Sequence, residues 1–128
     1  MSGTDMKSHT VGWIGTGKMG YPMAGLLIEA GADVKVYNRT AAKAEPLGVE
    51  VVGKPSDLAD RDIVFSIVTD DTAIREMITG PDGVLSGGTL PKIISDSSTI
   101  SIDTSKEMRA ACEAKGVMFL ATPISGNG

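Results

Sequence analysis

Short apolar runs alternate with helical patterns along this chain. Runs rich in Val, Ile, Leu and Phe predict six β-strands, at residues 9–14, 33–37, 49–52, 62–69, 92–95 and 117–120. Apolar residues recurring at three- and four-residue steps predict helices at 18–30, 71–79 and 102–115, with shorter helical segments at 41–47 and 55–57. Alternation of this kind is typical of βαβ units rather than of a helical bundle or a sandwich.

The pattern predicts a Rossmann-type, doubly wound α/β fold, in which helices cover both faces of a mainly parallel six-stranded sheet. The expected strand order is 3-2-1-4-5-6, and ligands then bind beyond the carboxyl ends of the strands. The fourth strand is almost continuously apolar, so we expect it to be buried on both faces. We expect residues 9–128 to form this one domain and residues 1–8 to be a disordered extension.

A glycine-rich turn follows the first strand, with the spacing G-x-G-x-x-G at Gly15, Gly17 and Gly20. Glycines let main-chain N–H groups and a helix N-terminus approach a pyrophosphate without obstruction by a Cβ atom. Three glycines alone are a weak signal because 16 of the 128 residues are glycine, but here the turn lies between a strand and a helix. The predicted cofactor-binding residues of this turn are Gly15, Thr16, Gly17, Lys18, Met19 and Gly20, with Lys18 expected to be solvated.

The end of the second predicted strand indicates which nicotinamide dinucleotide is bound. An NAD site has Asp or Glu at this position, accepting a hydrogen bond from the ribose 2′-hydroxyl. This chain has Asn38, Arg39 and Thr40, and this set can bind a 2′-phosphate that a carboxylate would repel. The sequence therefore favours NADP(H) over NAD(H). The alternative is that Arg39 is an ordinary solvated surface residue.

Polar residues also follow the fourth and fifth predicted strands. Val68, Thr69 and Asp70 are predicted to line the adenosine side of the crevice, although Thr69 or Asp70 could also cap the next helix. Ser97, Ser98 and Thr99 place three hydroxyls toward the expected nicotinamide ribose, and the alternative is that they are ordinary turn and cap residues.

Composition narrows the possible partners. The formal net charge is −4 without a basic block, which argues against nucleic acid and anionic membranes. Cys112 is the only cysteine and His9 the only histidine, so we expect no disulfide, no metal site and no catalytic triad. Cys112 lies on an apolar helix stripe and is predicted to be a core thiol. The absence of a signal peptide or a membrane-length apolar stretch makes the cytoplasm the expected location.

The glycine-rich turn is part of a longer motif that resembles a known family. Residues 12–24 read GWIGTGKMGYPMA and match the pattern G-x-I-G-x-G-x-M-G-x-x-M-A of the β-hydroxyacid dehydrogenases. This family includes 3-hydroxyisobutyrate dehydrogenases, tartronate semialdehyde reductases and glyoxylate/succinic semialdehyde reductases. The Asn-Arg-Thr segment, Ser98-Thr99-Ile100 and Pro123-Ile124-Ser125-Gly126 extend the resemblance over residues 10–128.

The resemblance implies further site residues. Thr99 would contact the cofactor near the nicotinamide, with Ser98 beside it on the substrate side. Ser125 and Gly126 would bind the carboxylate of a small hydroxy acid or semialdehyde substrate. Asn127 replaces a family glycine, which would change the size and polarity of that pocket.

The resemblance also implies that the catalytic lysine, the general acid/base, lies beyond Gly128, together with a helical domain that usually makes the dimer. We therefore assign no catalytic residue in this chain and expect it to bind NADPH without turnover. Oligomerisation is expected only with that further domain. The alternatives are a stand-alone nucleotide-sensing module, a 6-phosphogluconate dehydrogenase-like enzyme and an imine-reducing enzyme.

Overall fold

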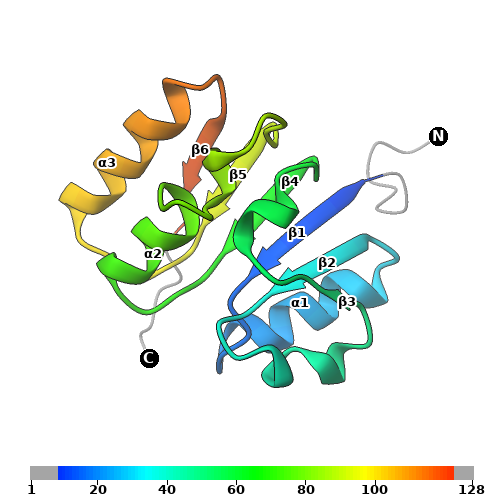
Figure 1. Cartoon of the computed structure of the whole chain (residues 1–128). Helices are drawn as coiled ribbons and strands as arrows, with labels where there is room; N and C mark the ends of the chain where they lie inside the picture. The colour runs from blue at the N-terminus through cyan, green and yellow to red at the C-terminus, as the bar shows by residue number, and fades with distance from the viewer. Residues whose placement is uncertain (1–8, 123–128) are drawn as a thin grey trace.

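The computed structural model describes residues 9–122, which form one sheet flanked by helices (Figure 1). The strands are β1 (Thr10–Ile14), β2 (Asp33–Tyr37), β3 (Glu50–Val51), β4 (Ile63–Ser66), β5 (Ile93–Asp96) and β6 (Met118–Ala121). The α-helices are α1 (Gly20–Glu29), α2 (Asp71–Ile78) and α3 (Ile102–Glu113). Short 3-10 helices are η2 (Ala41–Lys43), η3 (Glu45–Leu47), η4 (Pro55–Leu58) and η5 (Val84–Ser86). The predicted extension, residues 1–8, lies outside the described residues.

The sheet confirms the predicted fold class and strand order. Its order is β3-β2-β1-β4-β5-β6, and all five neighbouring pairs are parallel. The register aligns Ile14 with Tyr37 on one side and with Ser66 on the other, and Ser66 in turn with Asp96. The carboxyl ends of β1, β2, β4 and β5 therefore finish at one level, which brings the loops that follow them together.

Different helices cover the two faces of the sheet. A larger apolar cluster includes Leu58, Ile74, Met108 and Phe119, and packs η4, α2 and α3 against one face. A smaller cluster around Trp13 and neighbouring valines packs α1 and η3 against the other face. Figure 1 shows α2 and α3 beside the β4–β6 half of the sheet, with α1 beside the β1–β3 half. The β4–β6 half therefore has most of its helical cover on one face.

Because helices cover one face of this half of the sheet incompletely, one sequence prediction is wrong. We expected β4 to be buried on both faces, but only Val64 and Ser66 are buried, whereas Ile63 and Phe65 are partly exposed. These two partly exposed side chains belong to the smaller cluster on the α1 face. On the neighbouring elements Leu26, Met118 and Leu120 are exposed as well. A continuous apolar run therefore marked a central strand without specifying cover on both faces.

The predicted core thiol has the burial that the sequence indicated. Cys112 and Met108 on α3 are fully buried in the larger cluster. Trp13 on β1 is 3% exposed, packs against Phe65 with ring centroids 5.3 Å apart, and donates a hydrogen bond from its indole Nε1 to the carbonyl oxygen of Gly15 at 2.8 Å. Trp13 thus joins the hydrophobic core directly to the glycine-rich turn.

Candidate functional site

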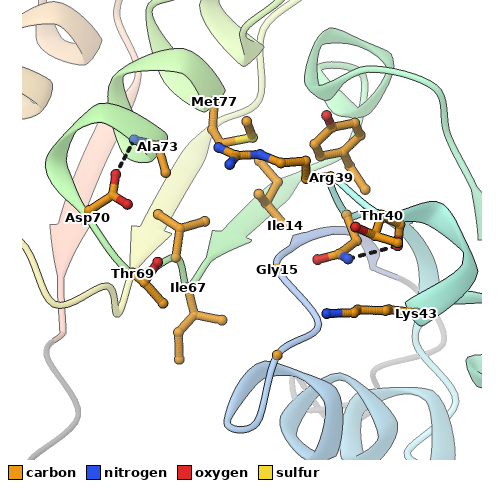
Figure 2. A pocket seen from close by; sticks show the side chains of 14 residues that line it. Ile14, Gly15, Arg39, Thr40, Lys43, Ile67, Thr69, Asp70, Ala73 and Met77 are labelled. Atoms are coloured by element: carbon orange, nitrogen blue, oxygen red, sulfur yellow. Dashed lines mark hydrogen bonds between the residues drawn. The ribbon is translucent and has the colours of Figure 1, made fainter.

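The carboxyl ends of β1, β2 and β4, which finish at one level in the sheet, border a cavity of about 310 Å³. Figure 2 shows its wall, to which the glycine-rich turn, the loop after β2, the loop after β4 and α2 all contribute. The lining residues are Ile14, Gly15, Gly17, Tyr37, Asn38, Arg39, Thr40, Lys43, Ile67, Val68, Thr69, Asp70, Ala73 and Met77. The position of this cavity is the one expected for a ligand site in a doubly wound sheet.

The main chain of the glycine-rich turn forms one wall of this cavity. Gly15 has φ of 100°, and a Cβ atom there would collide with the carbonyl oxygen of Ile67. A Cβ atom at Gly20 would collide with the carbonyl oxygen of Gly15. A Cβ atom at Gly17, in contrast, would meet no atom of residues 9–122 within 4 Å apart from those of its two chain neighbours. Gly15 and Gly20 thus permit the tight turn, whereas Gly17 faces open space that a ligand can enter.

The N-terminus of α1, at Met19 and Gly20, opens into a second cavity that also borders Gly17. Within residues 9–122, no side chain caps this end of the helix, and its first turn carries no acidic residue. The hydroxyl of neighbouring Thr16 is also without a hydrogen-bond partner there, although the residue is only 5% exposed. Free N–H groups and the positive end of the helix dipole favour an anion, so a diphosphate fits this end.

This second cavity, of about 400 Å³, lies on the other side of the turn. Its lining residues are Gly17, Lys18, Met19, Gly20, Ile67, Val68, Thr69, Ser97 and Thr99. The two cavities share Gly17 and the loop of residues 67–69. An elongated site with an anion-binding centre between two halves matches the shape of a dinucleotide, with its diphosphate between two nucleosides.

The loop after β2 is fastened to the glycine-rich turn. The Oδ1 atom of Asn38 accepts a hydrogen bond from the main-chain N–H of Thr16 at 2.9 Å, and its Nδ2 donates to the carbonyl oxygen of Thr40 at 2.8 Å. The amide of Asn38 thus holds the loop in place. Arg39 and Lys43 line the cavity as its cations, and both are exposed.

The loop after β4 confirms one of the two roles considered for Asp70. Its Oδ1 accepts a hydrogen bond from the N–H of Ala73 at 2.7 Å and caps α2. Asp70 also lines the first cavity beside Val68 and Thr69. Capping the helix and bordering the cavity therefore coexist in one residue.

A buried carboxylate network connects the loops after β4 and β5. Asp96 is 3% exposed, and its Oδ1 accepts hydrogen bonds from the hydroxyls of Ser66 at 2.7 Å and Ser98 at 2.6 Å. The Oγ atom of Ser98 also accepts from the N–H of Val68 at 2.8 Å. Burial of Asp96 raises its pKa, while the hydrogen bonds from Ser98 and Ser66 oppose the shift. This network fixes the part of the wall that both cavities share.

Most of the predicted cofactor residues that the structure describes border the two cavities. Thr16 and Asn38 act partly by holding the loops, and the hydroxyl of Ser98 faces Asp96 and Val68. The predicted substrate residues Ser125, Gly126 and Asn127 lie outside the described residues, so their role stays a prediction. The sequence analysis missed Lys43, Ala73 and Met77. Spacing could have found Ala73 and Met77, because they share one face of a predicted helix, whereas it carried no signal for Lys43.

Residues 9–122 contain no group of three or more His, Cys, Asp or Glu side chains arranged to hold a metal ion. Within the same range, no helix has the length and apolar character required to cross a membrane.

The sequence has longer relatives. A "Probable 3-hydroxyisobutyrate dehydrogenase-like 1, mitochondrial" of Arabidopsis thaliana is 37% identical over 91% of this chain and 36% of its own length. An "Uncharacterized oxidoreductase" of Shewanella frigidimarina is 41% identical over 91% of this chain and 42% of its own length. The chain thus spans about two fifths of the length of these relatives.

Solved structures agree with the fold. The 3-hydroxyisobutyrate dehydrogenase of Mycobacterium tuberculosis with L-serine matches 92% of this chain and 41% of its own chain, with a TM-score of 0.81 and 31% identity. Psf3 in complex with NADP+ and 2-OPP matches 91% of this chain and 43% of its own chain, with a TM-score of 0.81 and 28% identity.

The family described as the NAD binding domain of 6-phosphogluconate dehydrogenase matches residues 10–128, nearly the whole chain. The cleft with its two cavities and the relatives above agree with this match. The chain belongs to this family, and it is similar to the corresponding part of a 3-hydroxyisobutyrate dehydrogenase and of a 3-hydroxyisobutyrate dehydrogenase-like protein.

Proposed function

We propose that this chain is the NADP(H)-binding domain of an oxidoreductase that acts on a small β-hydroxy acid or semialdehyde. The observation that carries the cofactor preference is the chemistry of the β2 end of the first cavity. Position 38 is an asparagine whose amide is engaged by the main chain, and Arg39 and Lys43 provide two cations beside it. A phosphate dianion is stabilised by such a pair, whereas a ribose hydroxyl gains much less from it.

The arrangement of the two cavities supports distinct roles for their residues. Gly17 and the N-terminus of α1 would hold the diphosphate through main-chain N–H groups. Ala73 and Met77 would give the adenosine half an apolar wall, and Thr99 would lie in the nicotinamide half. When bound, the nicotinamide cofactor supplies the hydride chemistry. The contribution of this chain is to bind and orient it.

The substrate class rests on the family relationship and on the predicted residues Ser125, Gly126 and Asn127. The general acid/base is proposed to lie outside this chain, so the 128-residue chain would bind cofactor without turnover. Steady oxidation of NADPH with glyoxylate or succinic semialdehyde by this chain alone would contradict that part of the proposal.

The cofactor preference is tested by titrating NADPH and NADH side by side. We expect NADPH to bind more tightly, and we expect Arg39→Asp to reverse the preference, because the new carboxylate repels the 2′-phosphate and accepts from a ribose hydroxyl. Lys115→Asp is the matched control, since it makes the same charge change at an exposed residue that precedes β6, near the opposite ends of the strands. Equal affinities of the unmodified chain for the two cofactors would overturn the proposal.

A further inference from the structure

An ion pair connects the loop after β2 to α2, two elements that contribute Arg39 and Met77 to the wall of the first cavity. Arg39 follows β2, whereas Glu76 lies on α2, and the guanidinium Nη2 of Arg39 is 3.4 Å from Oε1 of Glu76. Figure 2 shows the Arg39 side chain extending toward Met77, the neighbour of Glu76 that lines the cavity. Both partners are exposed, with 69% and 59% of their side-chain surfaces accessible, so the pair can open.

We propose that Glu76 is a specificity-determining residue, whose carboxylate competes with the 2′-phosphate of the cofactor for Arg39. This inference rests on the proposed function, in which Arg39 binds that phosphate. A 2′-phosphate must take Arg39 from Glu76 or share it against the repulsion of a second anion. A 2′-hydroxyl carries no charge and meets neither obstacle. Glu76 therefore weakens binding of the 2′-phosphate but not of the 2′-hydroxyl. It thereby reduces the preference for NADP(H) over NAD(H) that Arg39 creates.

The cation next to Glu76 in sequence does not relieve this competition. Arg75 precedes Glu76 on α2, but its Nε atom donates to both carboxylate oxygens of Glu107 on α3, at 3.2 and 3.1 Å. Its Nη2 atom donates to Oγ1 of Thr104 at 3.1 Å. Arg75 is thus engaged toward α3, whereas Glu76 pairs with the arginine at the cavity.

The expected effect is modest, because both side chains of the pair are exposed to solvent. Exposed ion pairs contribute little free energy, so removing the negative charge should tighten phosphate binding about two- to five-fold. The gain should shrink as salt rises, because exposed charges are screened.

The test compares adenosine 2′,5′-bisphosphate with 5′-AMP by titration calorimetry on the 128-residue chain. The two probes differ only in the 2′-phosphate. We expect Glu76→Gln to raise the affinity for the bisphosphate about two- to five-fold and to leave the affinity for 5′-AMP unchanged. Glu107→Gln is the matched control, since it removes the same charge from the Arg75 pair and should change neither affinity.

The same titrations separate this inference from the proposed function. If Arg39→Leu weakens binding of the bisphosphate alone but Glu76→Gln changes nothing or tightens both probes equally, the inference fails and the proposed function stands. If the unmodified chain binds both probes equally or neither, the proposed function fails as well. In the Arg39→Leu background the gain from Glu76→Gln should largely disappear, and a gain that persists in full would overturn the competition for Arg39.

Discussion

The two walls of the cleft differ in the atoms that determine their shape. The wall formed by the β1–α1 turn consists of main chain, and its shape depends on the absence of side chains at Gly15 and Gly20. The wall formed by the loops after β4 and β5 depends on the side chains of Ser66, Asp96 and Ser98, which tie two loops to one carboxylate. The first wall is therefore sensitive to atoms added at Gly15 or Gly20, whereas the second is sensitive to the loss of hydrogen-bonding groups.

This difference predicts opposite kinds of sensitivity. A methyl group added at Gly15 or Gly20 should damage the main-chain wall, and removal of a polar group should damage the side-chain wall. The variants below test this contrast, beginning with the largest expected effect.

Gly20→Ala should destabilise the fold most. The added Cβ would overlap the carbonyl oxygen of Gly15, and since that atom is main chain, relief requires the whole turn to move. We expect the free energy of unfolding in urea to fall by roughly 3 kcal/mol or more. The matched variant Gly17→Ala adds the same methyl group in open space. It should leave stability nearly unchanged and weaken cofactor binding, so equal losses of stability in both variants would contradict the assignment.

Asp96→Ala should be the next most damaging change. It leaves the buried hydroxyls of Ser66 and Ser98 without their shared acceptor, and each unsatisfied buried group is unfavourable. We expect a loss of about 2 kcal/mol in the free energy of unfolding, together with weaker cofactor binding, because the loop at Val68 loses its anchor. A variant with full stability and full affinity would show that the network does not support the wall.

Trp13→Phe tests the connection between the core and the main-chain wall. The variant keeps an aromatic ring beside Phe65 but removes the hydrogen bond to the carbonyl oxygen of Gly15. We expect the free energy of unfolding to fall by about 1–2 kcal/mol in urea titrations. A comparable loss from Phe65→Leu with no loss from Trp13→Phe would indicate that packing alone, without the hydrogen bond, holds this part of the turn.

The smallest expected effect is a pH dependence confined to the side-chain wall. Because burial raises the pKa of Asp96, the folded state holds this proton more tightly than the unfolded state. The resulting stabilisation is fully present below the ordinary pKa of 3.8 and is lost as pH rises through the raised value. Asp96→Asn does not titrate, so stability of the variant relative to the unmodified chain should improve as pH rises from about 4 to about 7.

The pKa values of two other carboxyl groups are lowered, but these groups are present in both the unmodified chain and Asp96→Asn. Hydrogen bonds from the main-chain N–H groups of Thr10 and Ser101 lower the pKa of Asp62 and Asp71 respectively. Their contributions cancel in the difference between the unmodified chain and Asp96→Asn. A difference that stays constant over the pH range would show that Asp96 has no raised pKa.

The main-chain wall was largely predictable from sequence, and the side-chain wall was not. The positions of Gly15, Gly17 and Gly20 follow from spacing, because glycine is required where a backbone must turn or approach a ligand closely. The link between Asp96 and Ser66 depends on the register that places β4 beside β5. A single sequence does not contain that register, so the hydroxyl of Ser66 could not be assigned to Asp96 in advance.

Strand order was predictable and local burial less so. Apolar runs separated by helices specify a doubly wound sheet, because crossover connections between parallel strands are right-handed. Whether Phe65 and Leu26 are covered depends on which helices pack over each face, and an apolar residue carries no signal for its own cover. The role of Asn38 was hidden for a similar reason, since its partner Thr16 is 22 residues away in sequence.

The buried thiol of Cys112 gives the chain a built-in reporter of unfolding. Burial raises the pKa of Cys112 to about 11, and the residue is the only cysteine in the sequence. A thiol-alkylating reagent at neutral pH therefore finds neither access nor thiolate until α3 separates from the sheet. The labelling rate of this single site can thus rank the variants in native buffer, free of denaturant.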